Sequence, residues 1–141
     1  TRDMALSCAG YGDLGNFRSQ ARRRLSGHIE DSHTDRLVEQ YGSDVDSLIE
    51  RFESDHTLTE ALCASRPNLV AEVVHAAESE MALTLEDVIY RRTGLGTIGY
   101  PGRECVERCA EIMMQLRGWD EARKSREIES LNRYRWRGGT E

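Results

Sequence analysis

The sequence predicts an all-α fold, a compact bundle-like array of about six to seven helices. Across most of the 141 residues, apolar side chains recur at spacings of three and four, which places them on one face of an α-helix. No segment alternates apolar and polar residues with the period of two that is typical of a strand. Glycines and helix-capping residues separate the periodic segments, so most of the helices have an expected start and end.

Three helices are expected in the first half of the chain. The first begins at Asp13, whose side chain can cap it. The second covers about 31–41, and Gly42 then suits the left-handed position that closes a helix. Ser43 is the expected cap of the third, and residues 53–65 form a connection with a short turn. The expected apolar faces consist of Leu14, Phe17, Ala21 and Leu25, then Leu37, Val38 and Tyr41, and then Val45, Leu48, Ile49 and Phe52.

The remaining helices are expected in the second half. Pro67 suits the first turn of a fourth helix, where a missing N–H costs nothing, and this helix continues to Met81 or Leu85. Thr84 and Asp87 have the spacing of a cap and a third-position acid, which indicates a kink or a new helix. The later expected elements are a helix ending at Thr93, a loop over 94–102, a helix over 103–116 and a last helix from about Trp119 to Trp136.

Charge and cysteine usage argue against several classes of protein. The chain carries 19 Lys and Arg against 25 Asp and Glu, a net charge of −6, which disfavours a general nucleic-acid binder. Its four cysteines form no CxxC pair, so a zinc ribbon or thioredoxin-like site is not expected. No apolar run approaches the roughly 18 residues of a membrane helix. No glycine-rich phosphate loop follows a predicted strand, so no dinucleotide-binding unit is expected.

One pair of residues has the spacing of metal ligands. Glu72 and His75 form an ExxH, which places a carboxylate and an imidazole on one helix face. Di-iron bundles use two such motifs and two more glutamates, whereas this chain has only one. A hydrogen bond between helices is therefore the favoured interpretation, and a small metal-binding protein is the alternative. Cys105 and Cys109 are expected to be small buried core residues. No catalytic residue is assigned.

A set of polar residues follows the fourth and fifth predicted helices. Carboxylates and guanidinium groups beside an apolar stripe suggest a partly buried network, because an unpaired buried charge is costly. Such a network can orient two helices without catalysing a reaction, and this is the role expected here. The set consists of Glu72, Glu80, Thr84, Asp87, Arg91, Arg92 and Thr93.

Three segments carry a family resemblance. They are LVEQYGSDVDSLIERF (37–52), AEVVHAAESEMALTLEDVIYRRTGLG (71–96) and GWDEARKSREIES (118–130). In this order they resemble the C-terminal helical domain of FAD-dependent glycerol-3-phosphate dehydrogenases and α-glycerophosphate oxidases. The most specific matching residues are Glu72, Glu80, Met81, Ala82, Thr84, Glu86, Asp87, Val88, Arg91, Arg92 and Thr93.

The resemblance implies a parent enzyme that oxidises glycerol 3-phosphate to dihydroxyacetone phosphate, with FAD as hydride acceptor and a quinone or oxygen reoxidising it. In this family the FAD-binding and catalytic residues lie in the larger N-terminal part. The chain is therefore expected to be an accessory domain that is inactive alone and binds no cofactor itself. The expected organisation is a lead-in from the flavin domain over 1–12, one helical domain over 13–137 and a tail over 138–141.

The expected partner is the N-terminal FAD domain of the same parent chain. Binding to nucleic acid is not expected. A homo-oligomer and a peripheral membrane contact of the parent stay open. The expected location is the cytoplasm, or the inner face of the cell membrane as part of the parent. A free-standing helical interaction module is the competing interpretation.

Overall fold

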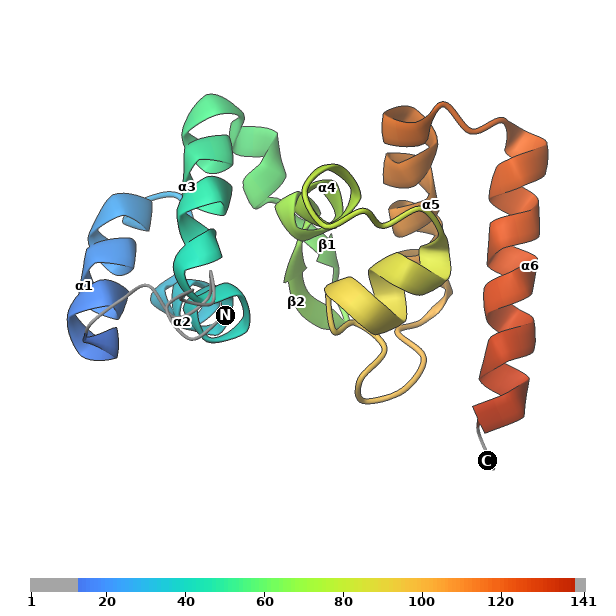
Figure 1. Cartoon of the computed structure of the whole chain (residues 1–141), viewed down its shortest axis with the longest axis horizontal. Coiled ribbons are helices and arrows are strands. Elements are labelled where there is room, and N and C mark those ends of the chain that lie inside the picture. The colour runs from blue at the N-terminus through green and yellow to red at the C-terminus, as the bar shows by residue number, and fades with distance from the viewer. Residues whose placement is uncertain (1–12, 139–141) are drawn as a thin grey trace, which may run out of the picture. The chain divides into compact units, whose positions relative to one another are not determined.

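The structure, a computed structural model, describes residues 13–138, with side chains described as far as Arg133. This part of the chain contains six α-helices and one short two-stranded sheet, so the predicted helical class is confirmed (Figure 1). The predicted lead-in over 1–12 and residues 139–141 of the predicted tail lie outside the described range. The chain divides into two compact units, one ending at Thr59 and the other beginning at Glu60.

The first unit consists of α1 (Leu14–Leu25), α2 (Asp31–Tyr41) and α3 (Val45–Ser54), followed by the 3-10 turn η3 (His56–Thr59). Asp13 caps α1 as predicted, because its side chain accepts a hydrogen bond of 2.9 Å from the Gly15 amide. The predicted cap at Ser43 is wrong. This residue lies in the 3-10 turn η2 (Gly42–Asp44), and α3 begins only after that turn.

The core of the first unit is built from the predicted apolar faces, with two exceptions. Leu14 is 42% exposed and Phe17 is only half-buried; both lie near the start of α1. The arginines of α1 bond the carboxylates of its neighbours: Arg22 pairs with Asp35 on α2, and Arg24 with Asp46 on α3. The buried apolar residues are Ala21, Leu25, Leu37, Val38, Tyr41, Val45, Leu48, Ile49 and Phe52.

The second unit starts with a hairpin that the sequence did not predict. Strands β1 (Ala61–Cys63) and β2 (Arg66–Leu69) pair antiparallel, with an irregularity between Ala61 and Cys63. Pro67 therefore lies in β2 and not in the first turn of a helix, and its side chain is exposed. Proline is tolerated there because a two-stranded sheet leaves edge positions without a ladder hydrogen bond.

Helix α4 (Val70–Glu78) is shorter than predicted and forms the centre of the second unit. Its residues from Val70 to Ala77 are all buried, which is typical of a helix that other elements surround. After a short turn the chain enters a second helical segment at Leu85, most of which is the π-helix η4 (Asp87–Arg92). The predicted break at Thr84 is therefore confirmed.

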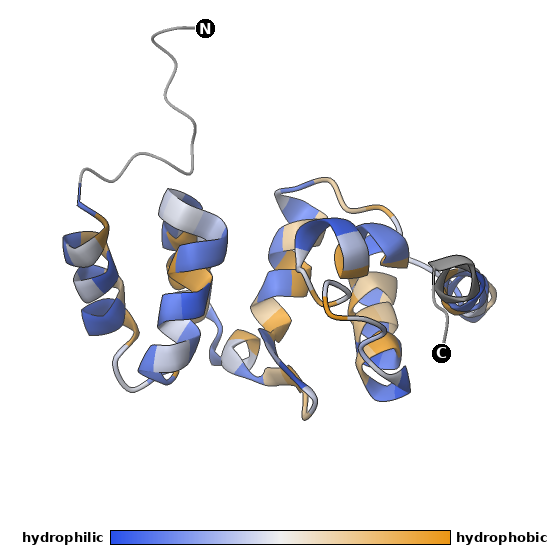
Figure 2. Cartoon of the chain, turned by 90° about the horizontal axis from the view of Figure 1, so that it is seen from below, coloured by the Kyte–Doolittle hydropathy of each residue, from blue (hydrophilic) through white to orange (hydrophobic). Residues whose placement is uncertain are grey.

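Helices α5 (Arg103–Arg117) and α6 (Glu121–Gly138) complete the second unit and lie side by side (Figure 1). Gly118 closes α5 with a positive φ of 65°. Helix α6 is largely hydrophilic along its described length, whereas α4 and α5 carry many of the buried apolar residues of the unit (Figure 2). None of the helices in the described range is long and apolar enough to span a bilayer.

Candidate functional site

A buried carboxylate lies at the junction of β2, α4 and η4. Glu72 is fully buried, and both of its carboxylate oxygens accept hydrogen bonds. Its Oε1 accepts from the Leu69 amide at 2.7 Å, and its Oε2 accepts from Asn68 Nδ2 at 3.0 Å. Asn68 Nδ2 also donates to the Thr93 carbonyl at 3.0 Å. Glu72 and Asn68 therefore connect the hairpin, the central helix and the end of the π-helix.

The position of Glu72 in α4 explains how the fold tolerates this charge. Glu72 is the third residue of the helix, and Leu69 is the residue that precedes its first turn. A carboxylate there satisfies an amide that has no partner inside the helix, and the positive end of the helix dipole favours its charge. Asn68 supplies the second donor to Glu72. The sequence did not indicate this role, because Asn68 also bonds the Thr93 carbonyl, which lies 25 residues away in the chain.

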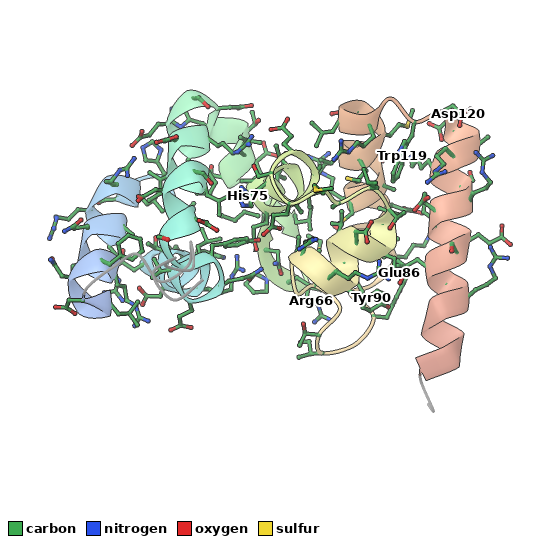
Figure 3. The ribbon with its side chains drawn as sticks, in the orientation of Figure 1. Arg66, His75, Glu86, Tyr90, Trp119 and Asp120 are labelled. Atoms are coloured by element: carbon green, nitrogen blue, oxygen red, sulfur yellow. The ribbon has the colours of Figure 1, made fainter. Side chains whose placement is uncertain are left out.

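His75 lies one turn after Glu72 on α4 and is buried (Figure 3). In the described part of the chain, no three His, Cys, Asp or Glu side chains come together as metal ligands. Glu72 accepts hydrogen bonds from a main-chain amide and from a side-chain amide, which is the geometry of a structural hydrogen-bond acceptor.

A second polar group begins the helical segment that contains η4. Asp87 Oδ2 accepts from the amides of Leu83 and Thr84, at 3.1 and 3.0 Å, and from Thr84 Oγ1 at 2.8 Å. In return, Thr84 Oγ1 accepts from the Asp87 amide at 3.1 Å, which completes a reciprocal cap. Burial alone would raise the pKa of Asp87, but the combined hydrogen bonds from Thr84, Leu83 and Arg91 outweigh it and lower that pKa below its ordinary value.

The remaining members of the predicted polar set lie nearer the solvent. Arg91 forms ion pairs with Glu86 and Asp87, yet its side chain is 55% exposed. Arg92 is also exposed, and Glu80 is half-buried. The structure thus separates two groups, a buried one around Glu72 and Thr93 and a surface one formed by Thr84, Asp87 and Arg91.

The loop after η4 is tied to both the π-helix and the hairpin. Thr93 Oγ1 donates to the Val88 carbonyl at 2.6 Å, and the Gly96 amide donates to the Ile89 carbonyl at 2.9 Å. From the hairpin, Ser65 Oγ donates to the Pro101 carbonyl at 3.1 Å. Arg66, labelled on β2 in Figure 3, reaches the carbonyls of the same loop.

Three buried thiols lie near one another where β1 packs on α5, but they are not arranged as a group that could hold a metal ion. Cys63 comes from β1, and Cys105 and Cys109 come from α5. The predicted burial of Cys105 and Cys109 is confirmed. A hydrogen bond with Cys109 lowers the pKa of Cys105 to about 7, and the same bond raises the pKa of Cys109 well above its ordinary value. Burial raises the pKa of Cys63, whose Sγ lies 3.5 Å from Ser65 Oγ. Cys63 joins this cluster through a tertiary contact, and no sequence spacing indicated it.

Comparison with known proteins gives one family match and several partial relatives. The model of the C-terminal domain of alpha-glycerophosphate oxidase matches residues 1–124. Glycerol-3-phosphate dehydrogenase 2 of Mycobacterium bovis is 33% identical over 94 residues, which is 65% of this chain and 16% of that protein. The aerobic glycerol-3-phosphate dehydrogenase of Bacillus subtilis is 27% identical over 140 residues, or 94% of this chain and 25% of the relative. No solved structure matches.

These curated relatives are much longer than the region that matches. A probable mitochondrial glycerol-3-phosphate dehydrogenase of Dictyostelium discoideum is 26% identical over 108 residues, 76% of this chain but 17% of its own length. The chain thus spans between 16% and 25% of the three relatives named here. Because the family model matches most of its residues, the chain belongs to the family of C-terminal domains of alpha-glycerophosphate oxidase.

Proposed function

We propose that this chain acts as the C-terminal accessory domain of an FAD-dependent enzyme that oxidises glycerol 3-phosphate to dihydroxyacetone phosphate. The observation that carries the proposal is the family match over residues 1–124. The partial matches to longer glycerol-3-phosphate dehydrogenases support it. The proposed role of the domain is structural: it packs on the flavin-binding part of the parent and supports its shape.

The described residues themselves do not fit an FAD site. A Rossmann-type flavin site requires parallel strands joined by a crossover helix, with a glycine turn at the phosphate. The strands described in residues 13–138 are β1 and β2, which pair antiparallel and are only three and four residues long. Within the proposal, hydride transfer to FAD and reoxidation by a quinone or oxygen therefore belong to the rest of the parent enzyme.

Location is part of the same proposal. We place the parent enzyme in the cytoplasm, associated peripherally with the inner face of the cell membrane. A flotation assay with vesicles that contain anionic lipid tests this location. The parent should float with the vesicles, and failure to float would contradict the peripheral contact.

The experiment for the function isolates the native protein with an antibody against this chain. The expected product is a polypeptide several times longer than 141 residues that carries flavin absorbance and reduces a dye when glycerol 3-phosphate is added. A flavin-free protein of only this length would instead support the free-standing interaction module. Stoichiometric metal that is lost in His75→Ala would support the metal-binding alternative.

A matched pair of variants tests the structural role within the active parent. Glu72→Ala removes the buried acceptor, whereas Glu78→Ala removes an exposed carboxylate from the same helix. We expect Glu72→Ala to lower the thermal stability of the holoenzyme while KM for glycerol 3-phosphate stays unchanged, and Glu78→Ala to change neither. A rise in KM in Glu72→Ala alone, without loss of stability, would contradict a purely structural role.

A further inference from the structure

The turn between α4 and the next helical segment presents two apolar side chains to the surface. Met81 is 78% exposed and Leu83 is 57% exposed, whereas Ala82 between them is fully buried. The buried alanine anchors the turn, and the two larger side chains contribute little to the core of the unit. We call residues Met81, Ala82 and Leu83 the Met81 turn.

The backbone at Met81 adopts a strained conformation. Met81 has a φ of 60°, and among the described residues it is the one residue other than glycine with a positive φ. Glycine adopts this conformation readily, whereas a residue with a Cβ is strained there. Because the exposed methionine side chain adds little to the packing of this unit, the fold by itself gains nothing from having methionine in place of glycine.

Neighbouring elements hold the Met81 turn in one conformation. Arg117, at the end of α5, donates hydrogen bonds to the carbonyls of Ala77 and Ala82. The Ala82 amide donates to the Ala76 carbonyl at 2.9 Å, and the Leu83 amide donates to Asp87 at 3.1 Å. The two apolar side chains are thus presented by a backbone that is already ordered, which lowers the entropy cost of binding.

We propose that the Met81 turn is the surface by which this domain docks on the larger part of its parent chain. The inference rests on the proposed function. The occupant follows from the family, because the chain spans only 16–25% of the relatives named above and belongs to a family of C-terminal domains. The flexible, polarizable side chain of methionine fits an irregular apolar recess, so the complementary surface is an apolar recess on that larger part.

Ile98 offers a matched control within the same unit. Its side chain is 79% exposed, nearly the same as that of Met81. It lies in the loop after η4 and has no strained backbone, and a single exposed apolar residue is ordinary on a protein surface. We therefore expect Ile98 to stay accessible in the parent enzyme.

Cysteine labelling tests the docking surface. Met81→Cys and Ile98→Cys are made separately in a Cys8→Ser background, where the three other cysteines are buried. Each variant is treated with a maleimide both as the 141-residue chain and as the full-length parent. Both cysteines should react rapidly in the short chain. In the parent, the cysteine at position 81 should react at least about tenfold more slowly while that at position 98 is unchanged, because burial limits reaction to transiently open states.

Equal labelling of both positions in the parent would overturn the docking surface, and so would equal slowing of both. Slow labelling in the short chain that disappears on dilution would assign the Met81 turn to a second copy and also overturn it. Hydroxyl-radical footprinting of the unmutated protein gives a second readout, in which oxidation of Met81 should be suppressed in the parent alone.

The two proposals fail in different ways. An active, flavin-containing parent in which position 81 labels rapidly refutes the docking surface and leaves the function standing. A long parent without dehydrogenase activity in which position 81 is protected refutes the function and leaves the docking surface standing. If the native polypeptide consists of this chain alone, both proposals are refuted.

Discussion

Single residues show how the second unit holds together. Glu72 satisfies the Leu69 amide and Asn68 in a place that water does not reach. Asn68 in turn satisfies the Thr93 carbonyl. A buried group of this kind is stable only when every partner is present, because loss of one leaves the others without a hydrogen bond.

The first prediction concerns this buried carboxylate in the isolated chain. Glu72→Ala should lower the free energy of unfolding by about 2–4 kcal/mol, because it leaves buried donors unsatisfied. Denaturant unfolding followed by circular dichroism measures this loss. The control, Glu78→Ala, should change the free energy by less than about 0.5 kcal/mol, since that carboxylate is exposed. Similar small effects of both variants would mean that water reaches Glu72.

The sequence alone could place some of these residues but not pair them. Thr84 and Asp87 are three residues apart, and the cap they form is a local interaction that spacing predicts. Asn68 and Thr93 are brought together by the path of the chain through α4, which no local pattern encodes. The same limit applies to Arg91, whose half-exposed position depends on which face of the helical segment the unit covers.

The hairpin and the π-helix are elements that differ from those the sequence predicts. Each strand of the hairpin has only three or four residues, too few to show alternation, and two adjacent residues of each strand are buried. At the other side of α4, residues 87–92 widen into a π-helix whose end is closed by Thr93 and Gly96. The two glycines that follow this helix have different local environments: Gly94 has a φ of 66°, and Gly96 lies against the ring of Tyr90.

The second prediction tests this close approach. A Cβ at Gly96 would lie 2.2 Å from Tyr90 Cδ1 and 3.2 Å from the Ile89 carbonyl oxygen. Gly96→Ala should therefore destabilise the chain by about 1–3 kcal/mol, because the ring or the loop must move. Tyr90→Ala should reduce the cost of Gly96→Ala in a double-mutant cycle measured by thermal unfolding. Additive effects of the two changes would contradict direct contact.

A control for the same substitution type is available in α1. At Gly15, a Cβ would make only an ordinary contact of 3.4 Å with Asp13. Gly15→Ala should leave the free energy of unfolding unchanged or raise it by up to about 1 kcal/mol, since alanine favours the helix.

On the scale of the whole molecule, the chain is organised as two compact units, each with its own buried residues. The single domain over 13–137 expected from the sequence stays a prediction. In the second unit, α4 is surrounded by the hairpin, η4 and α5, and α5 also packs on β1 and α6. This arrangement keeps the buried residues around Glu72 and the three thiols within residues 60–141.

The third prediction follows because the buried residues of the second unit lie within the unit itself. Residues 60–141 expressed alone should fold cooperatively, with a helical circular dichroism spectrum and dispersed amide resonances, because their core is internal to the unit. As a control, residues 80–141 lack the hairpin and α4 and should not unfold cooperatively. Absence of a cooperative transition in the 60–141 piece would show that its core depends on other residues.

Helical periodicity, capping residues and the family-specific segments were enough to establish the helical class, most helix boundaries and membership of the family. These features are local, so the order of residues encodes them directly. The hairpin, the Asn68–Glu72–Thr93 junction and the cluster of Cys63 with Cys105 and Cys109 were decided by tertiary structure. Each depends on contacts between residues that lie far apart in the chain or in elements too short to leave a pattern, and such contacts form only when the packed core fixes their geometry.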